Sequence, residues 1–289
     1  MVKNRTMHKL YCGVIVPLVT PLNEDGELDE QAVRRILDHV IAAGVQGVFI
    51  LGTTGEGPST PREMRARMVQ LVLEYVAGRA QVYVGVYDNV ISAMLDSSRD
   101  YLRKGATAVV AQLPGYYRLP PDDQFRFLST MVKSIPGPFL LYDIPAVVHM
   151  SIDPGVIEHL RAFSNLVGII DTSGNRERLL GLLDSYADDE GFSVLVGSTA
   201  QAAHGFEYGA DGFVPSAGNL NPSLCVRLYQ AAQKGDSILM ASLQQEINGL
   251  QAQYAADGYI GLTISRLKKR MADEGLCGPG VLPPLQEQD

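Results

Sequence analysis

The chain has 289 residues, of which 46% are hydrophobic, and this is enough for one large domain or two small ones with a full core. A formal net charge of −8 argues against nucleic acid or an anionic membrane surface as a partner. No apolar run approaches the ~20 residues of a membrane span, and three widely spaced cysteines without a CxxC pair predict free thiols in the cytoplasm.

Strand-like and helix-like patterns alternate along most of the chain. The first apolar strand, 13–19, ends at Thr20 and Pro21, and the next, 47–51, runs into the sequence GTTGEGPS. The pattern Thr60-Pro61-x-Glu63 predicts a capping box at the start of the helix that follows. Further strands are expected at 81–87, 107–113, 138–145, 166–170, 192–197 and 211–215.

Eight strand–helix units at these spacings predict a (β/α)8 TIM barrel in the α/β class. The alternative is an open doubly wound sheet, but that fold needs a Gly-rich dinucleotide turn after the first strand, where this chain has PLVTPLNEDG. We expect a single domain over 1–289, with the barrel at 11–235 and a C-terminal helical extension at 236–289. That extension is expected to cover a barrel flank or an oligomer contact.

Function in a barrel is expected in the loops that follow the strands. In this chain those loops carry many hydroxyl groups, which can donate to an anion and relay protons. The set predicts a small carboxylate or 2-oxo acid as the ligand, with no metal site and no cofactor. The main candidates are Gly52, Thr53, Thr54, Tyr116, Tyr117, Tyr142, Asp143, His149, Asp171, Ser198 and Val214.

Four motifs occur in a characteristic order: GTTGE after the second strand, PGYY after the fourth, YDIP at the fifth and GIIDTSGN at the sixth. Together they resemble the dihydrodipicolinate synthase and N-acetylneuraminate lyase family of pyruvate-type class I aldolases. The resemblance covers roughly residues 11 to 285. It implies a lyase that acts on a small 2-oxo acid.

The resemblance also implies roles for single residues. Thr53 and Thr54 would hold the substrate carboxylate, Tyr142 would shuttle protons, and Tyr117 would reach the site of a neighbouring subunit. Gly52, Ile170, Ser198 and Val214 complete the expected substrate-binding set, and Asp143 or His149 is the candidate extra base. The structural alternatives are that the threonines are only turn residues and that Tyr142 is only a core residue.

Two departures from the family pattern bear on chemistry. The family carries GxKD or GxKE on the sixth strand, and its lysine forms an imine with the oxo acid; here Ile170 takes that place. An alkyl side chain cannot attack a carbonyl, so standard imine catalysis at this position is excluded. The synthases also carry an arginine after the fifth strand, where this chain has Val147. No lysine is expected in a strand-to-helix loop; Lys268 and Lys269 are assigned to the last helix.

Two hypotheses remain. The first is a divergent lyase that binds a small 2-oxo or hydroxy acid without a lysine imine. The second is a catalytically silent relative that binds a metabolite and acts as a sensor or regulatory subunit. Under both we expect a homodimer or homotetramer, with Tyr116 and Tyr117 near the contact between subunits.

Overall fold

A computed structural model describes residues 9–287, and it confirms the predicted barrel. Eight parallel strands close in sequence order, with β1 paired to β8. Residues 1–8 and 288–289, which include Lys3 and most of the polar leader of the predicted single domain, lie outside the described residues. The strands are β1 (Gly13–Pro17), β2 (Gly47–Ile50), β3 (Gln81–Gly85), β4 (Ala108–Ala111), β5 (Phe139–Asp143), β6 (Leu166–Asp171), β7 (Ser193–Val196) and β8 (Gly212–Phe213).

The strands are apolar on both faces because both faces are buried. Residues that point outward pack against the helices, as Ile169 does on β6. Residues that point inward, such as Phe49 and Ile170, fill the barrel. This alternation decides which residue at each strand end faces the barrel mouth.

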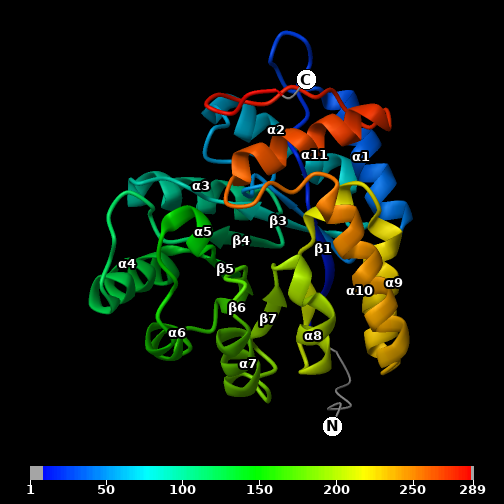
Figure 1. Ribbon diagram of the computed structural model, residues 1–289. Coiled ribbons are helices and arrows are strands. Elements are labelled where there is room, and N and C mark those ends of the chain that lie inside the picture. The colour runs from blue at the N-terminus through cyan, green and yellow to red at the C-terminus, as the bar shows by residue number, and fades with distance from the viewer. Residues whose placement is uncertain (1–8, 288–289) are drawn as a thin grey trace.

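Helices follow the strands around the outside of the barrel (Figure 1). Asp29, Asp153 and Asn221 cap α1, α6 and α9 by accepting from backbone amides two or three residues ahead. The helices are α1 (Glu30–Ala42), α2 (Arg62–Val76), α3 (Ile91–Arg103), α4 (Pro121–Ser134), α5 (Pro145–Val148), α6 (Pro154–Leu160), α7 (Arg176–Ser185), α8 (Ala202–Glu207), α9 (Pro222–Gln233), α10 (Ser237–Ala252) and α11 (Ile260–Asp273).

The predicted capping box at Thr60 is wrong. Pro61 is the N-cap residue of α2, and no side chain caps this helix. The Thr60 hydroxyl instead donates to the carbonyl of Glu56 at 2.8 Å, because Thr60 is buried in the turn that closes the loop after β2. The residue that could cap the helix is therefore used to fix the loop.

The two helices beyond the barrel take different places. Helix α10 lies beside α9 on the barrel flank, as expected (Figure 1). Helix α11 lies over the carboxyl ends of the strands, where its Ile260, Ile264 and Leu267 form a wall of the cavity described below. The prediction for the extension is thus correct for α10 and incomplete for α11. In residues 9–287, no helix is long and apolar enough to cross a membrane.

Candidate active site

A cavity of about 280 Å³ lies between α11 and the carboxyl ends of the strands. Six of the residues predicted from the sequence line it: Thr53, Thr54, Tyr142, Ile170, Ser198 and Val214. The rest of its wall consists of Pro17, Ile144, Ala146, Thr172, Gly197, Thr199, Ala200, Ser216, Gln251, Ile260, Thr263, Ile264 and Leu267. The volume lies just below the ~300–1,000 Å³ typical of ligand pockets, so the cavity suits a small molecule.

The loop after β2 lines this cavity with Thr53 and Thr54. Leu51 and Glu56 both have positive φ, 55° and 53°, and they bend the chain sharply on either side of the two threonines. Gly57 lies so close to the Leu51 carbonyl oxygen that a Cβ there would be 2.0 Å from it. Among the described residues, the amides of Thr53 and Thr54 donate to no other group. Successive free amides of this kind form a concave site for an anion.

Tyr142 lies at the end of β5 and points into the barrel. Its hydroxyl donates to Thr53 Oγ1 at 3.4 Å, and its ring meets the Phe49 ring edge to face at 5.9 Å between centroids. Burial raises the pKa of Tyr142 to about 12, and the hydrogen bond with Thr53 partly opposes the rise. Tyr142 therefore stays protonated near neutral pH and offers its proton to a ligand oxygen.

Ile170 is the residue beside Tyr142 in the sheet. The register of β5 and β6 pairs Tyr142 with Ile170, and that of β6 and β7 pairs Ile170 with Leu195. Its side chain points inward, is 1% exposed and lines the cavity. The cavity therefore has an alkyl group directly beside Tyr142.

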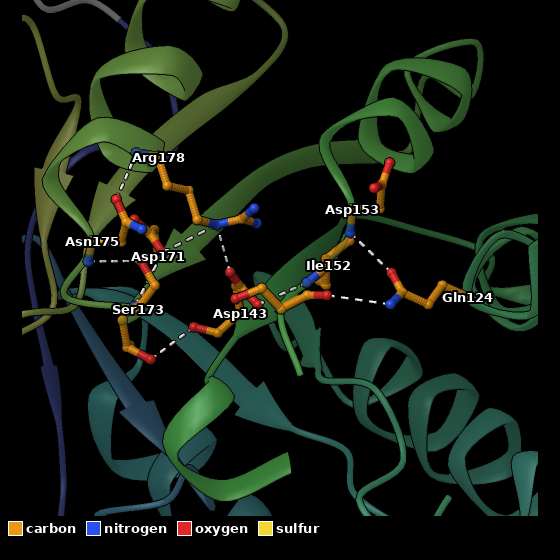
Figure 2. Close-up of polar contacts among 10 residues, drawn as sticks. Gln124, Asp143, Ile152, Asp153, Asp171, Ser173, Asn175 and Arg178 are labelled. Carbon is orange, nitrogen blue, oxygen red and sulfur yellow. Dashed lines mark hydrogen bonds and ion pairs between the residues drawn. The ribbon is translucent and has the colours of Figure 1, made fainter. Parts of the chain in front are cut away.

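Asp143, a predicted catalytic residue, does not line the cavity. It follows Tyr142 on the same strand and therefore points to the opposite face, toward α6 and α7 (Figure 2). Its Oδ1 accepts from the Ile152 amide at 2.9 Å, and its Oδ2 lies 2.8 Å from Arg178 Nε. Burial raises its pKa, whereas the Arg178 charge lowers it. We correct the expectation of a base here: Asp143 holds the strand end, as does Asp171, another of the candidates, which accepts from the Ser173 amide.

The remaining candidates, which are Gly52, Tyr116, Tyr117 and His149, also lie outside the cavity within one chain. His149 is exposed and ends α5 with a φ of 58°. Tyr117 is 71% exposed, and its ring meets that of Tyr116 edge to face at 4.8 Å between centroids. Tyr116 lines a separate cavity of about 460 Å³ over β3 and β4. A role for Tyr117 in the site of a neighbouring subunit stays a prediction.

The sequence reading did not find the pair that fixes α11. Lys268 and Glu56 are both fully buried, and Lys268 Nζ donates to Glu56 Oε1 and to the Thr20 carbonyl, each at 2.8 Å. Glu56 Oε2 also accepts from the Leu282 amide at 2.6 Å. Lys268 thus lies at the carboxyl end of the barrel, but its amine is bonded to Glu56 and to the Thr20 carbonyl, and it does not line the cavity. The feature of the sequence that could have predicted this pair is a lysine, Lys268, on the otherwise apolar face of the last helix.

Comparison with known proteins places the chain in a family. The model of the dihydrodipicolinate synthetase family matches residues 10–289. The chain belongs to this family. A 4-hydroxy-tetrahydrodipicolinate synthase of Bartonella bacilliformis is 30% identical over 94% of this chain and 91% of its own length. A probable 2-dehydro-3-deoxy-D-pentonate aldolase of Escherichia coli K12 is 28% identical over 96% of this chain and 94% of its own length.

Solved structures of the dihydrodipicolinate synthetase family have the same fold as this chain over nearly its whole length. The dihydrodipicolinate synthase of Bacteroides thetaiotaomicron has a TM-score of 0.91 at 29% identity, with 97% of this chain and 95% of that chain covered. An Escherichia coli K12 prophage protein of the family, solved with pyruvate, has a TM-score of 0.89 at 25% identity, with 97% and 94% covered. Within the described residues, no group of three His, Cys, Asp or Glu side chains could hold a metal ion.

Proposed function

We propose that this protein is a lyase-type member of its family that binds a small 2-oxo or 2-hydroxy acid beside Ile170 and acts on it without a lysine imine. The observation that carries the proposal is the cavity beside Ile170: it is lined by Thr53 and Thr54, whose amides have no partner among the described residues, and by a protonated Tyr142 whose hydroxyl donates to Thr53 Oγ1. A relative in the same family was solved with pyruvate, which supports this ligand class.

The chemistry follows from these groups. The Thr53–Thr54 loop holds the carboxylate, and Tyr142 donates to the 2-oxo oxygen. With a 4-hydroxy-2-oxo acid, the C4 hydroxyl loses its proton to water and becomes an aldehyde as the C3–C4 bond breaks; the bonding pair forms the C2=C3 double bond, and the Tyr142 proton moves to the oxo oxygen to give an enol. The Tyr142 anion then recovers the proton of the enol oxygen while water returns a proton to C3, which restores the ketone. An imine would accept the same electrons more readily, so we expect slow turnover.

Calorimetry with pyruvate tests the binding. Thr54→Val removes one hydrogen bond worth ~1.5 kcal/mol, and we expect about tenfold weaker binding. Thr130→Val is the matched control, because Thr130 is exposed on α4 and its hydroxyl donates to the Arg126 carbonyl. Equal affinity of wild type and Thr54→Val would reject this placement of the carboxylate.

Trapping with borohydride tests the absence of an imine. After incubation with pyruvate and borohydride, we expect the mass of the protein to be unchanged, because none of the lysines in residues 9–287 lines the cavity. A reduced adduct on Lys268 or any other lysine would show that an amine reaches the ligand. Binding without turnover of any 2-oxo acid would favour the silent, metabolite-binding relative instead.

A further inference from the structure

Among the residues that the structure describes, none with a charged side chain lines the cavity beside Ile170. The buried charges nearest to it are bound elsewhere: Lys268 pairs with Glu56, and Arg178 lies behind the strand ends with Asp143. A ligand in this cavity therefore meets only neutral donors. One carboxylate can be held by backbone amides and hydroxyls, but a second would have no counter-charge.

The polar groups that remain for a ligand are few. The hydroxyls of Thr172, Ser216 and Thr263 are already bonded, to the Asp143 carbonyl, the Tyr254 hydroxyl and the Ala256 backbone. The Thr54, Ser198 and Thr199 hydroxyls and the Gln251 side-chain amide have no partner among the described residues, and Tyr142 bonds only to Thr53, at a long 3.4 Å. All of these groups are neutral, so they suit one carboxylate and one oxo or hydroxyl oxygen but supply no counter-charge for a second carboxylate.

The opposite wall is apolar. Ile260, Ile264 and Leu267 of α11 face the strand ends, where Ile144 and Val214 add to the same surface. An aliphatic chain that extends from the oxo carbon meets these side chains instead of water. Each methylene that becomes buried there should strengthen binding about fourfold (~0.8 kcal/mol).

We propose that this cavity selects 2-oxo monocarboxylates with a short aliphatic tail and rejects 2-oxo dicarboxylates. The inference rests on the proposed function, since it concerns the same cavity. It goes further by assigning the tail-binding surface to α11 and by naming the charge that the site excludes.

A matched pair of ligands tests the inference by calorimetry. 2-Oxopentanoate and 2-oxoglutarate have the same carbon chain and differ in the terminal carboxylate. We expect affinity to rise about fourfold per carbon from pyruvate through 2-oxobutanoate to 2-oxopentanoate. We expect 2-oxoglutarate to bind at least ~100-fold more weakly than 2-oxopentanoate, because its second carboxylate stays unpaired.

A converse variant adds the missing charge. Ile264→Lys places an amine in the apolar wall and should shift the preference toward 2-oxoglutarate, whereas Ile238→Lys, at an 84% exposed site on α10, should leave it unchanged. If Ile264→Lys does not fold, the ligand series on the wild type still decides. Equal binding of the five-carbon pair, or a flat series of monocarboxylates, overturns the inference and leaves the proposed function standing. Failure of every 2-oxo acid to bind rejects both.

Discussion

Ile170 and Tyr142 lie side by side in the sheet. The Ile170 side chain is an alkyl group and carries no amine that could form an imine. Ile170→Lys would place an amine next to the Tyr142 hydroxyl. Burial depresses the pKa of such an amine and favours its neutral, nucleophilic form. We expect the variant to gain a borohydride-reducible pyruvate adduct at residue 170, detected as a mass increase.

The same variant should lose stability by ~1–3 kcal/mol, measured by denaturant unfolding, because an amine replaces a buried alkyl group. Ile238→Lys on the exposed face of α10 is the control and should neither trap pyruvate nor destabilise. A folded Ile170→Lys protein that binds pyruvate but traps none would contradict an arrangement like that of imine-forming lyases.

For single residues, prediction from the sequence depends on knowing which strand residues point into the barrel, and side chains alternate between the two faces of a strand. That Thr53, Thr54, Ile170 and Ser198 lie around one cavity could be predicted, because the carboxyl ends of parallel strands converge in a barrel. Asp143 was misjudged although the same period of two applies: its neighbour Tyr142 points inward, so Asp143 must point outward. Asp143 was predicted to be catalytic because it is a carboxylate, but its position on β5 points its side chain away from the barrel interior.

Among the elements, the junction of β5, β6 and α7 is held by one guanidinium. Arg178 Nε lies 2.8 Å from Asp143 Oδ2 and 3.8 Å from Asp171 Oδ1 (Figure 2). Thr172, which lines the cavity, donates to the Asp143 carbonyl at 2.7 Å. The cluster thus fixes the two strand ends that carry Tyr142 and Ile170.

Arg178→Met should cost ~3–5 kcal/mol at neutral pH, since it leaves two buried carboxylates without a cation. Burial already raises the pKa of Asp143 and Asp171 in the folded state, and losing Arg178 raises both further. A group with a raised folded pKa keeps its full stability contribution below its unfolded pKa and loses it as the pH rises through the folded value. Denaturant unfolding should therefore show a smaller loss at about pH 4.5 than at about pH 7.5.

The matched control is Arg161, which lies at the other end of β6 from the Arg178 cluster. Arg161 pairs with Asp189 at 2.8 Å and donates to the carbonyl of Leu166, the first residue of β6. Arg161→Met should destabilise without changing the affinity for 2-oxo acids, whereas Arg178→Met should weaken it as well. Equal losses at both pH values would show that Arg178 does not balance the two carboxylates.

The last helix shows where prediction from sequence stops at the level of elements. Ile260, Ile264 and Leu267 have helical spacing, so the helix itself could be predicted. Its place over the barrel mouth could not, because it depends on Lys268 reaching Glu56, which is 212 positions earlier in the chain. A periodic pattern identifies the apolar face of a helix but does not identify its partner.

For the whole molecule, eight strand–helix units were sufficient to predict closure into a barrel, because each crossover is local in sequence. Contacts between subunits are harder to predict from the sequence than the fold, and the clearest indication here is a pair of exposed aromatic side chains. Tyr116 and Tyr117 are 77% and 71% exposed on the loop after β4. Aromatic side chains are enriched at protein interfaces, so two adjacent exposed tyrosines favour a contact between subunits.

We predict a homo-oligomer, at least a dimer, in which this tyrosine pair lies at the contact. Light scattering at micromolar concentration should give at least twice the mass of the chain. Replacing both tyrosines by serine should shift the protein toward the monomer, because two buried aromatic anchors are lost from the interface. Tyr259→Ser is the matched control, since Tyr259 is 70% exposed and precedes α11 on another part of the surface. A wild-type monomer, or a double variant as oligomeric as the control, would remove the tyrosine loop from the assembly.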